Sequence, residues 1–279
     1  MSGQDRAKLK FLLQTVPPGF LVDAAWMKRH AISRQSMSAY VKQGWLERVA
    51  QGVYRRPLSP ADSMPFTEWR LPLLSAQWLM GYRFHVGSLS ALQLRGHQHY
   101  LQLGEERPIS LYGADTPLWL TRLQTDVRFV RRNDTLFGNM TGVEDSEFSL
   151  SVERDADLAL SPWRWPVRMS SPERAILEAL DELPTHESFH AVDVVFESLV
   201  NLRPKLLTAL LRECRSVKVK RLFFIYADKH AHAWRKHVDV SKIDMGRGDR
   251  ALTPGGRLHP IYHLTVPADL LPKEAEVGA

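Results

Sequence analysis

The stretch LVDAAWMKRHAISRQSMSAYVKQGWLERVAQGVYRRP, residues 21–57, decides the fold of the N-terminal part of the chain. Apolar residues at three- and four-residue spacings predict a short helix from about Asp23 to His30. Ser33 can cap a further helix, Arg34 to Gln43, because its hydroxyl can accept from the free amides of the first turn. Gly44 is then expected to end this helix in a left-handed conformation.

The residues on either side of these two helices predict a further helix before them and a hairpin after them. Leu46 to Tyr54 alternate around a Gln51-Gly52 turn, which predicts a two-stranded hairpin. Upstream, KLKFLLQ (8–14) predicts a helix that ends before a pair of prolines. The order helix, helix, turn, helix, hairpin predicts a winged helix-turn-helix domain over residues 1–57.

One face of the predicted helix 34–43 suits DNA. Met37, Tyr40 and Val41 form an apolar stripe, and polar side chains occupy the opposite face. Arg34, Gln35 and Ser38 are expected to read base edges, because Arg pairs with guanine and Gln with adenine. Lys42 and two hairpin arginines are expected to bind phosphates. The predicted DNA-binding set is Ser33, Arg34, Gln35, Ser38, Lys42, Gln51, Arg55 and Arg56. The alternative is a three-helix bundle whose polar face only meets water.

The distribution of charge favours the DNA interpretation. The whole chain has a net charge of +6, whereas residues 1–60 alone carry a net +7. The remainder is therefore close to neutral. A basic segment joined to a neutral remainder is typical of a polyanion-binding module attached to a second domain.

A proline-rich joint at residues 58–65 predicts a linker, with a larger second domain over residues 66–279. Helices are expected at 66–80, 86–96, 171–184, 190–200, 204–214 and 220–238, and strands at 108–113, 127–133, 148–154, 166–170 and 259–267. The strands and helices do not alternate regularly. The predicted fold class is therefore α+β, with an N-terminal winged helix followed by a larger mixed domain, and a doubly wound sheet is not expected.

The helix 171–184 has clear boundaries and a row of acids. Ser171 is its expected cap, Pro172 its first residue, and Pro184 its end. Its acids are expected to form a solvated face: Glu173, Glu178, Asp181 and Glu182.

The residues do not indicate an enzyme, a metal site or a cofactor. The spacings of a zinc protease helix, a phosphate-binding loop and a nucleophile elbow are absent from the sequence. His230 and His237 could share a helix face, but surface histidines are the expected interpretation. Cys214 is the only cysteine and lies in an amphipathic segment, so a buried structural thiol is expected.

The chain has no predicted membrane span or signal peptide. Its mean hydropathy is -0.26, and Pro17 and Pro18 break the short apolar run near the start. The expected location is the cytoplasm.

Three segments, taken in order, carry a resemblance to a known family. They are residues 22–57, MSSPERAILEALDELP (169–184) and GRGDRALTPGGRLHPIYHLTVP (246–267). Together they resemble the AbiEi antitoxins of bacterial type IV toxin-antitoxin systems, over about residues 20–267. Residues 116–157 match no part of the family pattern.

The resemblance implies an N-terminal winged helix that binds inverted repeats in its own promoter and represses its own operon. It implies a C-terminal domain that opposes a nucleotidyltransferase-like toxin, with or without direct contact. Residues 33–42 match the recognition helix and residues 51–56 the wing. Glu173 and Arg174 match a shared motif, for which a salt-bridged helix start is expected. Inverted repeats imply two copies of the chain on the DNA.

Two other functions remain alternatives to the antitoxin hypothesis. The chain could be a winged-helix regulator whose C-terminal domain binds a small ligand. The C-terminal domain could instead be an enzyme, such as a nuclease or a modifier of the toxin.

Overall fold

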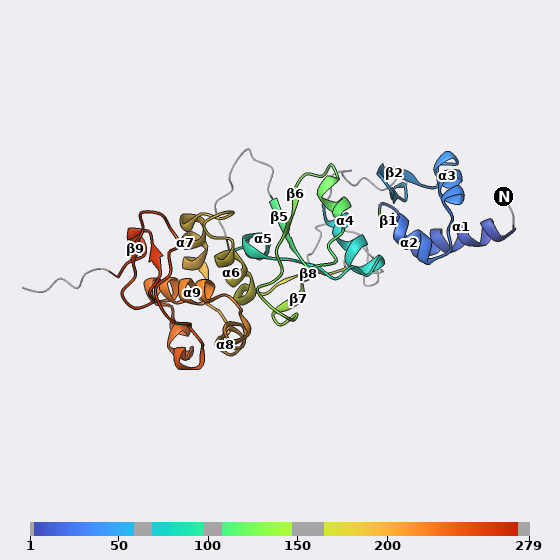
Figure 1. Cartoon of the computed structure of the whole chain (residues 1–279). Helices are drawn as coiled ribbons and strands as arrows, with labels where there is room; N and C mark the ends of the chain where they lie inside the picture. Colours follow the sequence, from blue (N-terminus) through green and yellow to red (C-terminus); the bar gives the residue numbers. More distant parts are fainter. Residues whose placement is uncertain (1–2, 59–68, 98–107, 147–164, 273–279) are drawn as a thin grey trace, which may run out of the picture. The chain divides into compact units, whose positions relative to one another are not determined.

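The structure, a computed structural model, describes residues 3–58, 69–97, 108–146 and 165–272. Figure 1 labels its helices and strands. The chain divides into two compact units. Unit 1 comprises Met1–His85, Glu105–Arg132 and Asp145–Arg168, and unit 2 comprises Val86–Gly104, Asn133–Glu144 and Met169–Ala279. Helices and strands are mixed in the way the sequence predicts, so the fold class is α+β.

Unit 1 begins with the winged helix. The predicted helices, the glycine stop and the hairpin are confirmed, with Gly44 at a φ of +76° and Gly52 at +72°. The elements are α1 (Gly3–Thr15), β1 (Leu21–Asp23), α2 (Ala24–Arg29), α3 (Arg34–Lys42), β2 (Glu47–Ala50) and β3 (Val53–Arg55).

The strand β1 was not expected from the sequence. It pairs antiparallel with β3, which gives the wing a sheet of order β1-β3-β2. It is only three residues long, and all three are buried. So short a segment has no periodicity that separates a strand from the start of a helix.

The rest of unit 1 combines a helix with parallel strands. The helix α4 (Arg70–Leu74) continues as a π-helical segment, η1 (Ser75–Leu79). The strands β5 (Pro108–Tyr112) and β6 (Arg128–Arg132) are parallel, and the 3-10 helix η2 (Leu118–Arg122) lies between them in the chain. The predicted start of the helix at 66–68 lies outside the described residues.

The five-stranded sheet has the strand order β6-β5-β4-β8-β7, where β4 is His85–Val86, β7 is Val143–Ser146 and β8 is Val167–Ser170. The strand β4 is parallel to β8. The strand predicted at 148–154 lies outside the described residues, and β7 was not predicted.

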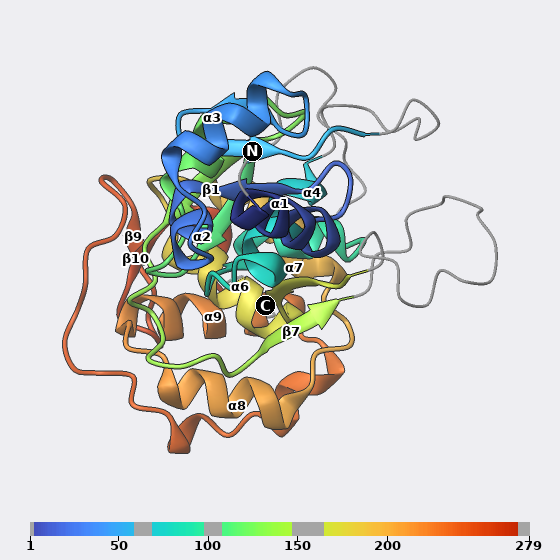
Figure 2. The same ribbon diagram turned by 90° about the vertical axis from the view of Figure 1, so that its right-hand side faces the viewer.

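Unit 2 is built around a central helix. The helix α6 (Pro172–Asp181) contacts four other helices of this unit. They are α5 (Ser88–Leu94), α7 (Phe189–Ser198), α8 (Pro204–Glu213) and α9 (Val217–His230), of which Figure 2 labels α7, α8 and α9. The predicted cap is confirmed, since the Ser171 side chain accepts from the amide of Arg174. The central position of α6 explains why almost all of its residues are buried.

The prediction of a solvated acidic face on this helix is wrong. Glu173 and Glu178 are each 1% exposed, and Glu182 is 7% exposed. Helices pack on several sides of α6, so no side faces water along its whole length. Charged side chains are almost never fully buried without partners, and the partners are described below.

Two further boundaries differ from the prediction. The helix predicted over 220–238 ends at His230, because Ala231 adopts a left-handed φ of 51°. A 3-10 helix, η5 (Ala233–His237), follows it. The final strand predicted over 259–267 is confined to β10 (Thr265–Val266), which pairs with β9 (Arg257–Leu258). His259 Nδ1 accepts from the amides of Ile261 and Tyr262, and this turn precedes the strand.

The predicted linker stays a prediction, because residues 59–68 lie outside the described part. Residues 69–85 belong to the same compact unit as the winged helix. Among the described helices, none combines the length and the apolar character that a membrane span needs.

Candidate functional site

The helix α3 is held in place by its buried face. Ser33 caps it, with Oγ 3.1 Å from the amide of Ser36. Met37 and Tyr40 are buried, and the Tyr40 hydroxyl donates to the backbone carbonyl of Asp5 in α1. The position of α3 is therefore fixed by the core of the winged helix rather than by its outer residues.

The outer face of α3 carries the residues that the sequence predicted. Arg34, Gln35, Ser38 and Lys42 are all exposed. Across the described ranges, none of them forms an ion pair or a side-chain hydrogen bond. Positions separated by four lie on the same side of a helix. The four side chains therefore form one row, here called the α3 row, which is available to a partner.

The wing carries the other predicted residues, which differ in whether they have intramolecular partners. Gln51 is exposed at the hairpin turn. Arg55 is paired across the hairpin with Glu47, at 2.5 Å from Nη2 and 2.9 Å from Nε to Oε2. Arg56 Nη1 donates to the carbonyls of Leu13 and Val16, at 2.6 and 2.7 Å. Both arginines thus have intramolecular partners, and the assignment of phosphate contacts to them stays a prediction.

The partners of the two wing arginines show that both side chains help to hold the winged helix together. The carbonyls of Leu13 and Val16 lie at the end of α1, where backbone acceptors lack helical partners, so Arg56 caps this helix. Partial burial lowers the pKa of Arg56. Glu47 and Arg55 occupy opposite positions in the strand register, so their pairing follows from the hairpin that the sequence predicted.

Sequence reasoning missed the role of Asp23. Its Oδ1 accepts from the amide of Trp26 at 2.7 Å, which makes it the cap of α2. Its Oδ2 accepts from the Tyr82 hydroxyl and from Trp119 Nε1, at 2.5 and 3.2 Å. Asp23 is only 5% exposed. The pattern of an Asp before a helix predicts the cap, but no local pattern identifies the two distant donors.

This carboxylate ties the winged helix to the rest of unit 1. Nearby, the Leu21 amide donates to Ser75 Oγ at 2.9 Å, and Trp26 Nε1 donates to the Leu79 carbonyl at 3.2 Å. Burial and the hydrogen bond to Asp23 raise the pKa of Tyr82. The winged helix and the segments η1 and η2 are therefore parts of one hydrogen-bonded assembly.

A second assembly surrounds the start of α6 in unit 2. The Arg174 guanidinium is 1% exposed and donates from Nε to Glu178 Oε1 at 2.8 Å. Its Nη1 donates to the carbonyls of Asn139 and Thr141, each at 2.9 Å. The guanidinium carbon lies 4.4 Å from the centre of the Phe137 ring. Arg174 therefore joins α6 to the segment that precedes β7.

The two acids of this assembly have separate partners. Glu178 Oε2 accepts from the Ser88 amide at 3.0 Å and from the Ser170 hydroxyl at 2.8 Å. Glu173 accepts from the amide and the guanidinium of Arg203, and these hydrogen bonds lower its pKa although burial opposes them. The structure thus supplies the salt bridges expected at the start of this helix, and their geometry fits a structural role.

The histidines and the cysteine do not form a metal centre in the described ranges, where no group of three or more possible ligands meets. His230 pairs with Asp193 at 2.8 Å, and its ring stacks on that of His232. The sequence allowed His230 and His237 to share a helix face, but α9 ends at His230 and His237 lies on η5. Cys214 is buried as expected, and burial raises its pKa to about 11.

Two family models match the chain, one over each part. Residues 5–103 match a family model described as transcriptional regulator, AbiEi antitoxin N-terminal domain. Residues 107–267 match a model described as transcriptional regulator, AbiEi antitoxin, type IV TA system. No curated protein matches the chain.

A solved structure shares the fold. The chain is similar to the crystal structure of the Rv2827c protein from Mycobacterium tuberculosis, with a TM-score of 0.56 and 16% sequence identity. The match covers 97% of this chain and 94% of that chain. At this identity the likeness concerns the fold alone, while the family models span most of the sequence. The chain belongs to the AbiEi antitoxin family of transcriptional regulators of type IV toxin-antitoxin systems.

Proposed function

We propose that this protein is a DNA-binding antitoxin that represses its own operon and counteracts a nucleotidyltransferase-like toxin. In this proposal the winged helix binds inverted repeats in the promoter of its own gene, with two copies of the chain on the DNA. Membership of a regulator family supports the role in transcription. The toxin and the promoter repeats come from the resemblance described above.

The observation that carries the proposal is the α3 row. Its four polar side chains are exposed on a helix whose other face is fixed by Met37 and Tyr40. A recognition helix uses this combination, because the major groove admits an α-helix and the polar side chains on its outer face must reach the base edges. Arg34, Gln35 and Ser38 are proposed to contact base edges, and Lys42 a phosphate. Ser33 and Gln51 would add contacts at the helix start and at the wing.

The wing arginines contribute to the proposal in a narrower way. Arg55 has Glu47 as its partner, and Arg56 has the end of α1. A phosphate contact from either side chain would have to be made alongside these partners or in exchange for them. Replacing Arg56 is therefore expected to weaken binding to every DNA sequence and also to destabilise the winged helix.

The first test is fluorescence anisotropy of the full chain on the DNA upstream of its own gene, against a scrambled duplex, at two salt concentrations. We expect preferential binding that weakens at higher salt, because phosphate contacts release counterions. Arg34→Ala should weaken binding to the upstream DNA by about 1–3 kcal/mol. Arg128→Ala, an exposed arginine on β6, is the matched control. Equal binding of both duplexes by the wild type would contradict the proposal.

The second test concerns the toxin. The full chain and its Arg34→Ala variant are expressed from an unrelated promoter together with the neighbouring toxin gene, and growth is measured. We expect both proteins to restore growth, since Arg34 serves repression rather than antagonism. Failure of the wild type to restore growth would contradict the antitoxin role, whatever the result with DNA.

A further inference from the structure

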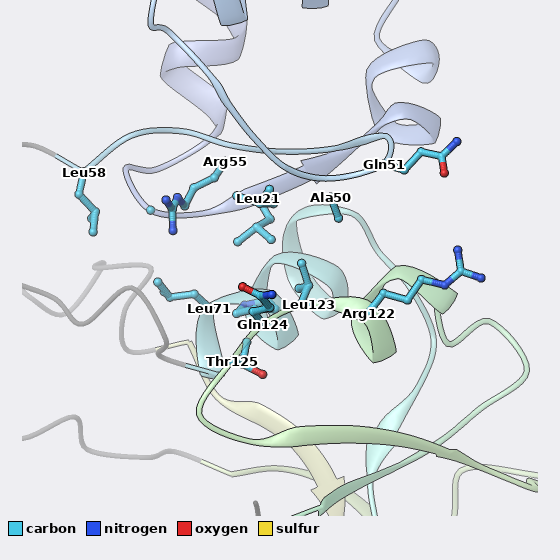
Figure 3. A pocket seen from close by; sticks show the side chains of 13 residues that line it. Leu21, Ala50, Gln51, Arg55, Leu58, Leu71, Arg122, Leu123, Gln124 and Thr125 are labelled. Carbon is cyan, nitrogen blue, oxygen red and sulfur yellow. The ribbon is translucent and has the colours of Figure 1, made fainter.

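A cavity of about 650 Å³ lies within unit 1, beside the wing (Figure 3). It is lined by β1, by the β2-β3 hairpin, by the start of α4 and by residues 122–125, which are the last residue of η2 and the three residues after it. We call it the wing pocket. Its volume falls in the range of about 300–1,000 Å³ that is usual for small-molecule sites. Gln51 and Arg55, two of the predicted DNA-binding residues, belong to its lining.

The walls of the wing pocket are joined to each other. The Leu21 amide donates to Ser75 Oγ, which connects β1 with the helix that continues from α4. Trp119 Nε1 donates to Asp23 Oδ2, which connects η2 with β1. The walls formed by β1, by the helix that continues from α4 and by η2 therefore already have fixed positions, and less ordering entropy would oppose ligand binding there.

The chemistry of the lining is uneven along the pocket. Figure 3 shows Gln51 and Arg122 at one end and Arg55 at the other. Between them lie the aliphatic side chains of Leu21, Ala50, Leu71 and Leu123, together with the neutral polar side chains of Gln124 and Thr125. The middle of the pocket therefore offers an apolar body aliphatic contacts and no charged group, and the two ends carry the guanidinium groups.

The sign of the charge follows from the same residues. The residues that line the pocket, all in the described part of the chain, include two arginines and no Asp or Glu. Arg55 is paired with Glu47, whereas Arg122 is exposed and has no ion pair with any residue that the structure describes. The uncompensated guanidinium is thus at the end that also holds the Gln51 amide. Guanidinium groups form strong charge-assisted hydrogen bonds with carboxylates.

We propose that the wing pocket binds a small organic anion with an apolar body, with its carboxylate at Arg122, and that occupancy alters the affinity for operator DNA. The second half rests on the proposed function. Its basis is that Val49, Ala50 and Gln51 belong both to the pocket and to the wing. A ligand that bridges this hairpin and residues 122–125 would change how far the wing can adjust to DNA.

The binding half is tested with two probes. The fluorescent anion 8-anilinonaphthalene-1-sulfonate reports binding directly, and decanoate competes with it, while decyltrimethylammonium is the cationic control. We expect decanoate to displace the dye and the cation to leave it bound. Arg122→Gln should weaken binding by about tenfold, as expected for loss of one charge-assisted contact. Arg128→Gln is the matched control and should bind like the wild type.

A second variant separates the apolar part of the site from its charge. Ala50→Phe places a ring in the middle of the pocket, and we expect it to abolish displaceable dye binding. Circular dichroism of each variant checks that the dye does not report a partly unfolded chain. If Arg122→Gln and Ala50→Phe both bind dye and decanoate like the wild type, the wing pocket is not the site and the proposal is overturned.

The regulatory half is tested by anisotropy on the upstream DNA with and without decanoate. We expect at least a threefold change in affinity for the wild type and none for Ala50→Phe. An unchanged affinity in a wild type that binds both DNA and decanoate would overturn regulation. Loss of DNA binding with intact decanoate binding would instead contradict the proposed function and leave the ligand site standing.

Discussion

Removing the Arg174 side chain should unfold unit 2 more readily than most single changes would. Arg174→Met keeps an unbranched chain of similar length and deletes the guanidinium, which is 1% exposed and makes hydrogen bonds to three acceptors. The acceptor Glu178 is equally buried, so the change removes the guanidinium that this buried carboxylate pairs with. Breaking one side of a buried pair costs about 3–5 kcal/mol. That is a large part of the roughly 5–15 kcal/mol that stabilises an ordinary protein.

A double variant identifies the source of this loss. Glu178→Gln removes the charge but keeps an oxygen that can accept from the Ser88 amide and the Ser170 hydroxyl. We therefore expect Arg174→Met/Glu178→Gln to recover roughly half of the lost free energy. The carbonyls of Asn139 and Thr141 remain without the guanidinium, so recovery should be incomplete.

The assay is urea unfolding followed by far-UV circular dichroism and by tryptophan fluorescence. The chain has two compact units, so the two signals are fitted separately before any two-state analysis. Arg212→Met, an exposed arginine on α8, is the matched control and should lie within about 0.5 kcal/mol of the wild type. The reasoning is refuted if Arg174→Met costs less than about 1 kcal/mol, or if adding Glu178→Gln restores nothing.

Three further outcomes follow from buried polar groups. Asp23→Ala should lower the free energy of unfolding in urea by about 2–4 kcal/mol, because α2 loses its cap and the donors Tyr82 and Trp119 lose their acceptor. Asp23→Asn keeps the cap and should lower it less. Equal losses in the two variants would contradict this account. Burial and the hydrogen bond to Asp228 raise the pKa of Tyr262 to about 12, above the value near 10 of an unfolded chain. Its contribution to stability is therefore complete below about pH 10 and is lost as the pH rises from about 10 to 12. Urea unfolding midpoints measured across this range should show the loss. Tyr262→Phe should make the midpoint depend less steeply on pH, and an equally steep profile in this variant would contradict the assignment to Tyr262. Because Cys214 is buried and burial raises its pKa to about 11, a thiol reagent at pH 8 should modify it slowly in the folded chain and rapidly in urea, and similar rates would mean that the thiol is accessible.

Local signals predicted the elements that begin with a capping residue and end at a glycine or proline. Both α3, with Ser33 and Gly44, and α6, with Ser171, were found in this way. A cap uses a side chain and an amide only three residues apart, so the sequence contains the whole interaction. The strand β1 depends instead on β3, more than thirty residues later, and nothing within Leu21–Asp23 indicates this partner.

The main error of the sequence-based prediction was to place the buried acids of α6 on a solvent-exposed face. The acids of α6 look like a solvated face because charged residues are mostly exposed. The four-residue spacing of Arg174 and Glu178 allows an ion pair in water as well as in a core, so it does not indicate burial. Only the packing of four other helices around α6 decides between the two.

The candidate DNA-binding face was predictable to the extent that it depends on one helix. Helical periodicity places the α3 row on the side opposite Met37 and Tyr40, and the structure agrees. The intramolecular pairing of the wing arginines could not be predicted in this way. Arg55 meets Glu47, and Arg56 meets the end of α1, only in the folded winged helix. The wing pocket could not be predicted, since its lining comes from four separate stretches of the chain.

The carboxylate of Asp23 bears on how the chain can be dissected. A fragment that stops at Pro57 would keep every helix and strand of the winged helix but would lose Tyr82 and Trp119, both of which donate to this carboxylate. It would also lose Ser75, the acceptor for the Leu21 amide, and Leu79, the acceptor for Trp26. The apolar surface between these groups would then face water. Weak DNA binding by such a fragment would report the exposed underside of the domain, so point variants in the full chain are the sounder way to study its recognition helix.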